Sequence, residues 1–149
     1  MQGIDKTLAM IMLVPSTVLF SWYNVYFNAN FGGTVGKLIM KIRIVKPDGR
    51  AISYVEAFKR SSIDLIFGVI SLLAQLYAIA QVDALVYTSA TWIERPVILQ
   101  EFNPAWFGAF ILLQHIWVWS ELIVILFNKR KRAIHDFIAG TIVVNKEFV

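Results

Sequence analysis

WFGAFILLQHIWVWSELIVILF, residues 106–127, is a largely apolar run of 22 residues, and the basic block NKRKR at 128–132 follows it directly. At ~1.5 Å per residue, a helix of this length covers about 33 Å, enough to cross the ~30 Å hydrocarbon layer of a bilayer. The cations that follow would hold its end at one membrane surface. The run therefore predicts a transmembrane helix in an integral membrane protein.

Two further apolar runs, residues 8–27 and 63–82, have a similar character. Of the 149 residues, 58% are apolar, above the ~45–50% that is usual for soluble domains. We therefore predict an all-α membrane protein that forms one domain over residues 1–149, with transmembrane helices at about 8–27, 63–82 and 106–127. The chain has no cysteine, which excludes disulfides and thiolate metal sites.

The cations are distributed unevenly along the chain. Of the 14 Lys and Arg, seven lie in residues 28–60 and five follow Phe127, whereas Arg95 is the only one in residues 81–105. By the positive-inside rule, residues 28–60 and the C-terminus are cytoplasmic in a multi-pass protein of the plasma membrane, and residues 81–105 are outside. We expect the cytoplasmic cations to contact anionic lipid headgroups. Because they flank membrane spans, nucleic acid is not an expected partner.

The connecting segments carry signals for small surface elements. Residues 38–45 partly alternate like a β-strand, Lys46-Pro47-Asp48-Gly49 is a turn sequence, and residues 50–54 can return as a second strand, so we expect a small cytoplasmic β-hairpin. Ser53-Tyr54-Val55-Glu56 is a capping box that begins the next helix. We expect a loop at 81–105, a short amphipathic helix at 133–139 and a strand at 141–144.

Polar residues recur inside the second and third spans, and helical spacing places them on one face of each helix. This predicted polar seam consists of Arg60, Asp64, Ser71 and Gln75 in the second span and Gln114 and Glu121 in the third. Burying a charge in a bilayer costs at least ~2.5–3.5 kcal/mol, so we expect the seam to lie between the two helices, with Arg60 bound to Asp64 or reaching Glu121. Two interpretations stay open: a path for protons or ions, or polar contacts that hold the helices together.

Sites of other kinds find less support in the sequence. His115 lies near the middle of the third span, either as a titrating group or as a neutral residue bonded to a neighbouring helix. His135 is the other histidine and lies at a different level, which argues against a metal site. No nucleophile–base–acid set is recognisable, so we do not expect an enzyme.

A glycine-rich segment also needs two interpretations. Gly32-Gly33-Thr34-Val35-Gly36-Lys37 is similar to a phosphate-binding loop, but that motif requires four residues between its glycines and a hydroxyl residue after the lysine. Here three residues separate Gly32 from Gly36, and Leu38 follows Lys37. We therefore predict no nucleotide and no other cofactor.

Two motifs resemble the RDD family of small prokaryotic membrane proteins. The first is Gly32-Gly33-Thr34-Val35-Gly36-Lys37, followed by Ile42-Arg43-Ile44-Val45 and Asp48-Gly49; the second is His135-Asp136-Phe137-Ile138-Ala139-Gly140-Thr141-Ile142-Val143-Val144. Arg60 and Asp64 open the span between the two motifs. The resemblance covers roughly residues 20–146. The family motif residues it implies are Gly32, Gly33, Thr34, Gly36, Lys37, His135 and Asp136.

The start of the chain departs from the family pattern. The family takes its name from one arginine and two aspartates, and the resemblance assigns the second aspartate to Asp136. The first pair normally lies on an N-terminal helix, but here Ile4-Asp5 has no arginine before it. The 26 residues between Asp5 and Gly32 are too few for the two helices usual there. Either that first helix is absent or the gene model starts late, and we favour the second explanation.

The resemblance leaves the function open, since most of the family is unassigned and some members are linked to transport or to ion and proton exchange. For Asp136 we expect an ion pair with Arg132 or with a cation of residues 37–60, as a structural contact that docks the tail or in a transport role. One candidate function is a transport or ion/proton-exchange component, homo-oligomeric or assembled with other membrane subunits. The other is a non-transporting scaffold or accessory subunit that binds lipid or a partner through its basic cytoplasmic face.

Overall fold

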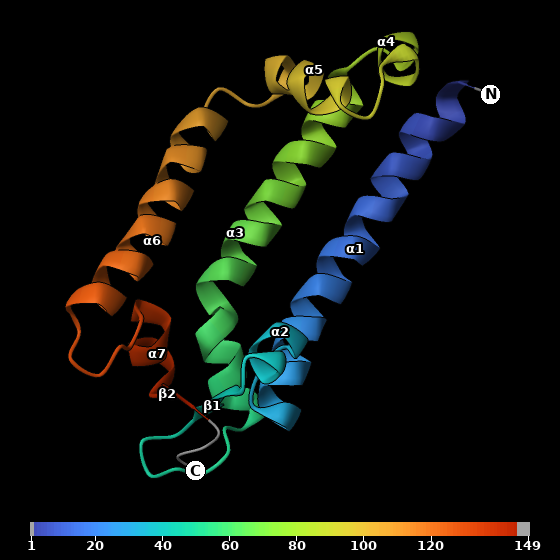
Figure 1. The fold of residues 1–149 in the computed structure, drawn as a ribbon. Helices are drawn as coiled ribbons and strands as arrows, with labels where there is room; N and C mark the ends of the chain where they lie inside the picture. Colours follow the sequence, from blue (N-terminus) through green and yellow to red (C-terminus); the bar gives the residue numbers. More distant parts are fainter. Residues whose placement is uncertain (1, 146–149) are drawn as a thin grey trace. The chain divides into compact units, whose positions relative to one another are not determined.

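Three long helices dominate the computed structural model, which describes residues 2–145, with side chains from Lys6 onward (Figure 1). They are α1 (Gln2–Phe31), α3 (Tyr54–Gln81) and α6 (Phe107–Phe127). The candidate membrane spans, Lys6–Ile39, Tyr54–Gln81 and Phe107–Phe127, include all three of the predicted spans apart from their outermost residues. The protein is thus an all-α membrane protein with a small sheet, as predicted. The side chain of Asp5, considered above, lies outside the described part.

Large apolar side chains point outward along these helices. The exposed fractions of Phe20, Leu126 and Trp119 are 70%, 61% and 60%. A soluble monomer rarely presents so much contiguous apolar surface to water. Lipid is the solvent in which this surface is stable, because a helix satisfies its own backbone hydrogen bonds there.

The chain divides into two compact units, and each long helix contributes to both. We call the first the loop unit, formed by residues up to Leu19 and by Ile66–Leu113. We call the second the tail unit, formed by Phe20–Leu65 and by the residues from Gln114 onward.

The sheet in the tail unit corrects the predicted β-hairpin. Strand β1 (Ile42–Val45) pairs antiparallel with the C-terminal strand β2 (Ile142–Asn145), in a register that sets Ile44 opposite Val143. The turn forms, with Gly49 N–H donating to Lys46 O at 2.9 Å, but the returning chain makes only a single bridge, Val45 to Ala51. Helix α3 begins too soon after the turn for a ladder, so the second strand comes from the tail.

A small apolar core holds this sheet against the helices. Ile44, Ile52 and Ala57 are buried together, and Val25, Ala29 and Val143 pack around them. The strand predicted at 141–144 is β2, and the amphipathic helix predicted at 133–139 is α7 (Ile134–Ala139). Both predictions are confirmed, so the tail is an integral part of this unit.

Helix α3 begins at the predicted capping box. Ser53 N–H donates to the Glu56 carboxylate at 2.7 Å, and the Ser53 hydroxyl donates to the same carboxylate. That hydroxyl accepts from Val55 N–H at 3.2 Å rather than from the expected Glu56 N–H. Lys46 adds an ion pair to Glu56 at 3.0 Å. The start of α3 is therefore linked to the turn that follows β1.

The loop unit corrects the loop predicted at 81–105. Two short helices occupy most of it: α4 (Ala84–Ser89) and α5 (Glu94–Phe102). The Asp83 carboxylate caps α4 by accepting from Leu85 N–H at 2.8 Å, and Glu94 accepts from Thr91 N–H at 2.9 Å at the start of α5. These caps supply the partners that short helices need for their first N–H groups.

The C-terminal end of α3 is also capped in the loop unit. The Lys6 ammonium donates to Ala80 O at 3.0 Å and to Val82 O at 2.6 Å. A cation at this end of a helix satisfies free carbonyls and opposes the negative end of the helix dipole. Ile79, Val82 and Tyr87 form a buried apolar core in the same unit.

Candidate functional site

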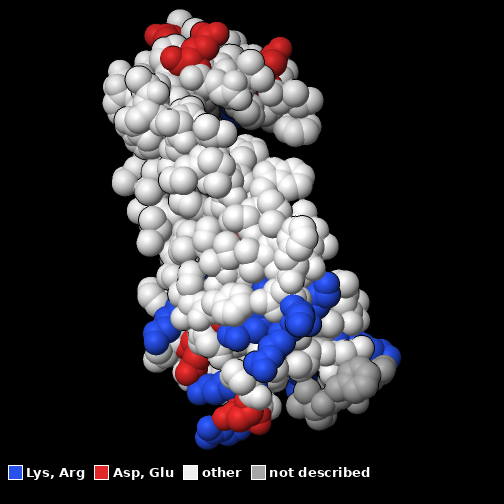
Figure 2. Space-filling model, turned by 90° about the vertical axis from the view of Figure 1, so that its left-hand side faces the viewer, with Lys and Arg blue, Asp and Glu red and all other residues white. Residues whose placement is uncertain are grey.

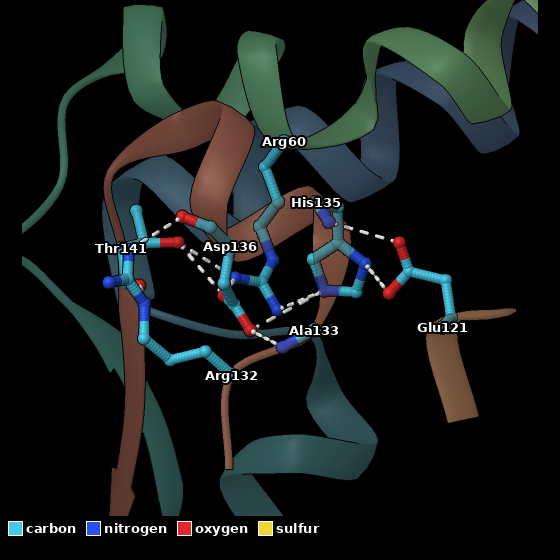
Figure 3. A network of polar contacts seen from close by, with 7 residues as sticks. All are labelled: Arg60, Glu121, Arg132, Ala133, His135, Asp136 and Thr141. Atoms are coloured by element: carbon cyan, nitrogen blue, oxygen red, sulfur yellow. Dashed lines mark hydrogen bonds and ion pairs between the residues drawn. The ribbon is translucent and has the colours of Figure 1, made fainter. Parts of the chain in front are cut away.

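A buried network of polar side chains links α3, α6 and the tail within the tail unit (Figure 3). Arg60 comes from α3, Glu121 from α6, and His135 and Asp136 from α7. Arg60 is 6% exposed and Asp136 1% exposed. Charges this deeply buried need partners, because an unpaired charge is costly in a medium of low dielectric constant.

The second motif folds back on itself to position Asp136. The Asp136 Oδ2 atom accepts from Ala133 N–H at 3.0 Å and so caps the start of α7. Gly140 ends the helix in the left-handed conformation, with φ of +67°. This turn brings Thr141 N–H to Asp136 O at 2.8 Å and the Thr141 hydroxyl to Asp136 Oδ1 at 2.9 Å. The spacing of His135, Asp136, Gly140 and Thr141 therefore has a direct structural cause.

Arg60 is held by the tail through both terminal nitrogens. Its Nη1 donates to the Asp136 carboxylate, forming an ion pair, and to Thr141 Oγ1 at 2.9 Å. Its Nη2 lies 2.6 Å from His135 Nε2. The sequence left two partners open for Asp136, Arg132 or a cation of residues 37–60. The structure shows the second, an ion pair with Arg60. Arg132 instead donates to the backbone carbonyls Thr141 O, at 3.0 Å, and Asp136 O, at 3.2 Å.

The contacts of His135 assign its tautomer. A guanidinium can only donate, so His135 Nε2 must accept from Arg60, and the ring proton belongs on Nδ1. Nδ1 lies 2.7 Å from Glu121 Oε2, and the backbone N–H of His135 donates to Glu121 Oε1 at 3.0 Å. Burial, together with the charges of Arg60 and Lys37, lowers the pKa of His135 to about 3. The imidazole is therefore neutral at physiological pH and bridges a cation and a carboxylate.

The first motif reaches the same region through Lys37. Its charge helps to lower the pKa of His135, which is an electrostatic link between the two motifs. Thr34 precedes the short helix α2 (Val35–Ile39), and Val35 N–H donates to the Tyr23 hydroxyl at 3.1 Å. The glycines shape the turn that leads from α1 into this helix.

Gly32 has a specific reason to be glycine. Its φ is +73°, and a Cβ there would lie 3.3 Å from Ile44 O. Its carbonyl accepts from Ile44 N–H at 2.6 Å, which joins the end of α1 to β1. Gly33 is also confined, since a Cβ there would lie 3.1 Å from the Lys37 side chain.

We expect Gly32→Ala to lower the free energy of unfolding by about 1–2 kcal/mol, because alanine is strained in the left-handed region. Gly36→Ala is the matched control. Gly36 is in α2 and its Cβ would meet nothing within 4 Å, so this change should be neutral or stabilising by about 0.4–1 kcal/mol. Unfolding of both variants in mixed micelles checks the pair. Equal losses would show that the backbone at Gly32 is not under constraint.

The other predicted seam residues are placed differently. Asp64 is exposed and accepts from the Trp117 indole N–H at 3.3 Å. Gln114 is half-buried on α6. Ser71 and Gln75 belong to the loop unit, where Gln75 lines a pocket. Arg60 thus turns toward the tail rather than binding Asp64, because the tail supplies a carboxylate that is already closed off from solvent.

Thr141 and Ala133 are site residues that sequence reasoning missed. Thr141 belongs to the quoted motif, and its distance of five residues from Asp136 across a glycine was the available signal. His115 is exposed on α6. Among the residues described, no group of three or more His, Asp or Glu side chains is placed to hold a metal ion.

The arrangement is a chain of donors and acceptors. It runs from Asp136 through Arg60 to His135, whose neutral imidazole lies 2.7 Å from the Glu121 carboxylate and whose backbone N–H donates to it. Such an arrangement can fix the tail in place, and it holds a carboxylate that can exchange a proton, Glu121, at the end of a candidate span.

Comparison with known proteins gives one match. A family model described as the RDD family matches residues 2–140. No curated protein and no solved structure shows a significant match to the chain.

Proposed function

Because the chain belongs to the RDD family, we propose that this multi-pass membrane protein acts in transport, as an ion- or proton-exchange component of the plasma membrane. The observation that supports this most is the buried chain of Arg60, His135 and Glu121. Glu121 lies on α6, one of the candidate spans, and its carboxylate lies 2.7 Å from His135 Nδ1 and accepts from the His135 backbone N–H. Intramembrane carboxylates next to titratable groups are typical of proton and ion pathways.

Charge distribution supports one orientation. Figure 2 shows Lys and Arg side chains gathered over the tail unit, whereas the face of the loop unit in this view carries acidic groups. We place the tail unit on the cytoplasmic side, where its exposed cations would meet anionic lipid headgroups. Since three helices rarely enclose a path, we propose that the protein works as a homo-oligomer or with other membrane subunits.

Reconstituted vesicles with an imposed pH or sodium gradient test the transport proposal. We expect the wild type to dissipate one of these gradients, and Glu121→Gln to slow that flux by about tenfold or more, because the carboxylate that exchanges the proton is lost. Glu101→Gln, a carboxylate change in the loop unit, is the control and should keep the wild-type rate. An unchanged flux in Glu121→Gln would contradict the role of this carboxylate.

The second candidate is a non-transporting scaffold or accessory subunit. The same network favours it, because Asp136 and Arg60 fix the tail and so present the exposed cations Lys129, Arg130 and Lys131 as one surface. Wild-type vesicles that hold both gradients, made from correctly folded protein, would favour this candidate over transport. We propose no enzymatic role.

A further inference from the structure

A pocket in the loop unit has features that the network in the tail unit does not explain. It has a volume of about 390 Å³ and is lined by α1, α3, α4, α5 and the segment before α5. Apolar side chains such as Met12, Leu13, Ile79 and Leu99 form much of its wall. Its size is in the range of small-molecule sites, which are typically apolar with a few polar groups.

Arg95 supplies a positive charge to this apolar wall. Its Nε donates to Tyr87 O and to Ala90 O, both at 3.2 Å, and its guanidinium lies over the Tyr87 ring at 4.8 Å from the centroid. The side chain is therefore fixed in place by groups that carry no negative charge. Among the side chains that the structure describes, from Lys6 onward, and the backbone of residues 2–145, no partner is recorded for Nη1 or Nη2.

Two carboxylates that are close to Arg95 in the sequence accept hydrogen bonds from other groups. Asp83 accepts from Leu85 N–H at the start of α4, and Glu94 accepts from the Thr91 N–H and hydroxyl, both at 2.9 Å. Among the described side chains, Arg95 makes no ion pair. A fixed guanidinium with two free donor nitrogens at the edge of an apolar pocket is complementary to an anion that carries an apolar chain.

We propose that this pocket binds an anionic amphiphile, with its acyl chain against the Met12 and Leu13 wall and its carboxylate or phosphate head at the Arg95 Nη atoms. Gln75 adds a polar group to the lining. Trp92, also part of the lining, is 80% exposed and suits the boundary between chain and headgroup. A neutral amphiphile would fill the same wall but leave the guanidinium donors unpaired. The proposal does not depend on the transport proposal above.

The test measures binding of oleate, dioleoyl phosphatidate and oleyl alcohol to the purified full chain in non-ionic detergent. We expect saturable binding of at least one anion, tighter than that of the alcohol. Arg95→Gln should weaken the binding of that anion by about tenfold or more, which is the usual contribution of a hydrogen bond to a charged group. The affinity for oleyl alcohol should not fall. Binding of oleate alone would identify a fatty acid, and binding of phosphatidate alone a phospholipid; either result supports the site.

Two further variants keep the test decisive. Met12→Trp leaves Arg95 intact and fills the pocket from a position that is 57% exposed. It should therefore lower the binding affinity for all three ligands, and it tests the pocket even if Arg95→Gln fails to fold. Arg43→Gln removes an exposed cation of β1 and should change nothing. Equal anion affinity in wild type and Arg95→Gln, wild-type binding by Met12→Trp, or alcohol binding as tight as anion binding would overturn the proposal.

Discussion

Arg60→Met is expected to lower the free energy of unfolding by about 3–5 kcal/mol, because Asp136 would remain buried without its cation. Asp136 is 1% exposed, so water cannot replace the guanidinium. His135 and Thr141 would lose the same partner. Titration with a denaturing detergent in mixed micelles, followed by circular dichroism, measures the change.

The double variant Arg60→Met/Asp136→Leu separates pairing from packing. Removing both charges leaves no buried ion behind, so we expect it to recover a large part of the loss caused by either single change. Arg43→Met, on an exposed position of β1, is the control and should stay within about 0.5 kcal/mol of the wild type. Losses that simply add in the double variant would contradict a buried ion pair between these two residues.

Stability should also fall in mild acid because of His135. Its pKa is about 3 in the folded protein and about 6.5 in an unfolded chain. Between these values the unfolded state binds more protons, so stability is complete above pH 6.5 and decreases as the pH falls toward 3. Lowering the pH from 7 to 5 should cost at most about 2 kcal/mol, less to the extent that the partly exposed ring is screened by solvent.

Two histidine variants isolate this effect. His135→Gln keeps a polar side chain that does not titrate, so its stability should change less than that of the wild type between pH 7 and pH 5. His115→Gln is the matched control and should keep the full pH dependence. The pH interval from 5 to 7 lies above the ordinary pKa of carboxylates, which is about 4. A wild-type profile no steeper than that of His135→Gln would show that His135 is not held neutral by the network.

Long-range pairing is the part of the fold that sequence reasoning could not supply. The three spans follow from apolar length, and the start of α3 follows from the Ser53–Glu56 capping box, since both signals are local. The hairpin prediction followed the turn at Lys46–Gly49, which is also local, whereas the observed partner of β1 is β2, about a hundred residues away. No alternation pattern identifies which of two short strands will pair.

The site was predictable to a similar extent. The motif residues Lys37, His135 and Asp136 were identified. The sequence left Asp64 and Glu121 open as partners of Arg60, and it left Arg132 or a cation of residues 37–60 open for Asp136. The Gly140 turn that shapes the second motif is local, but the contact between Asp136 and Arg60 joins residues 76 positions apart and is a tertiary feature. The two helices within 81–105 did leave a signal, since Thr91-Trp92-Ile93-Glu94 has the same capping pattern as Ser53-Tyr54-Val55-Glu56.

The tautomer of His135 tests the buried network most directly, and nitrogen NMR of histidine-labelled protein can read it. The chain has two histidines, so His115→Gln leaves His135 as the single signal to assign. The network predicts a neutral ring with the proton on Nδ1 and an accepting Nε2, unchanged from pH 7 to pH 5. A proton on Nε2, or titration near pH 6.5, would contradict the contact with Arg60 on which the site depends.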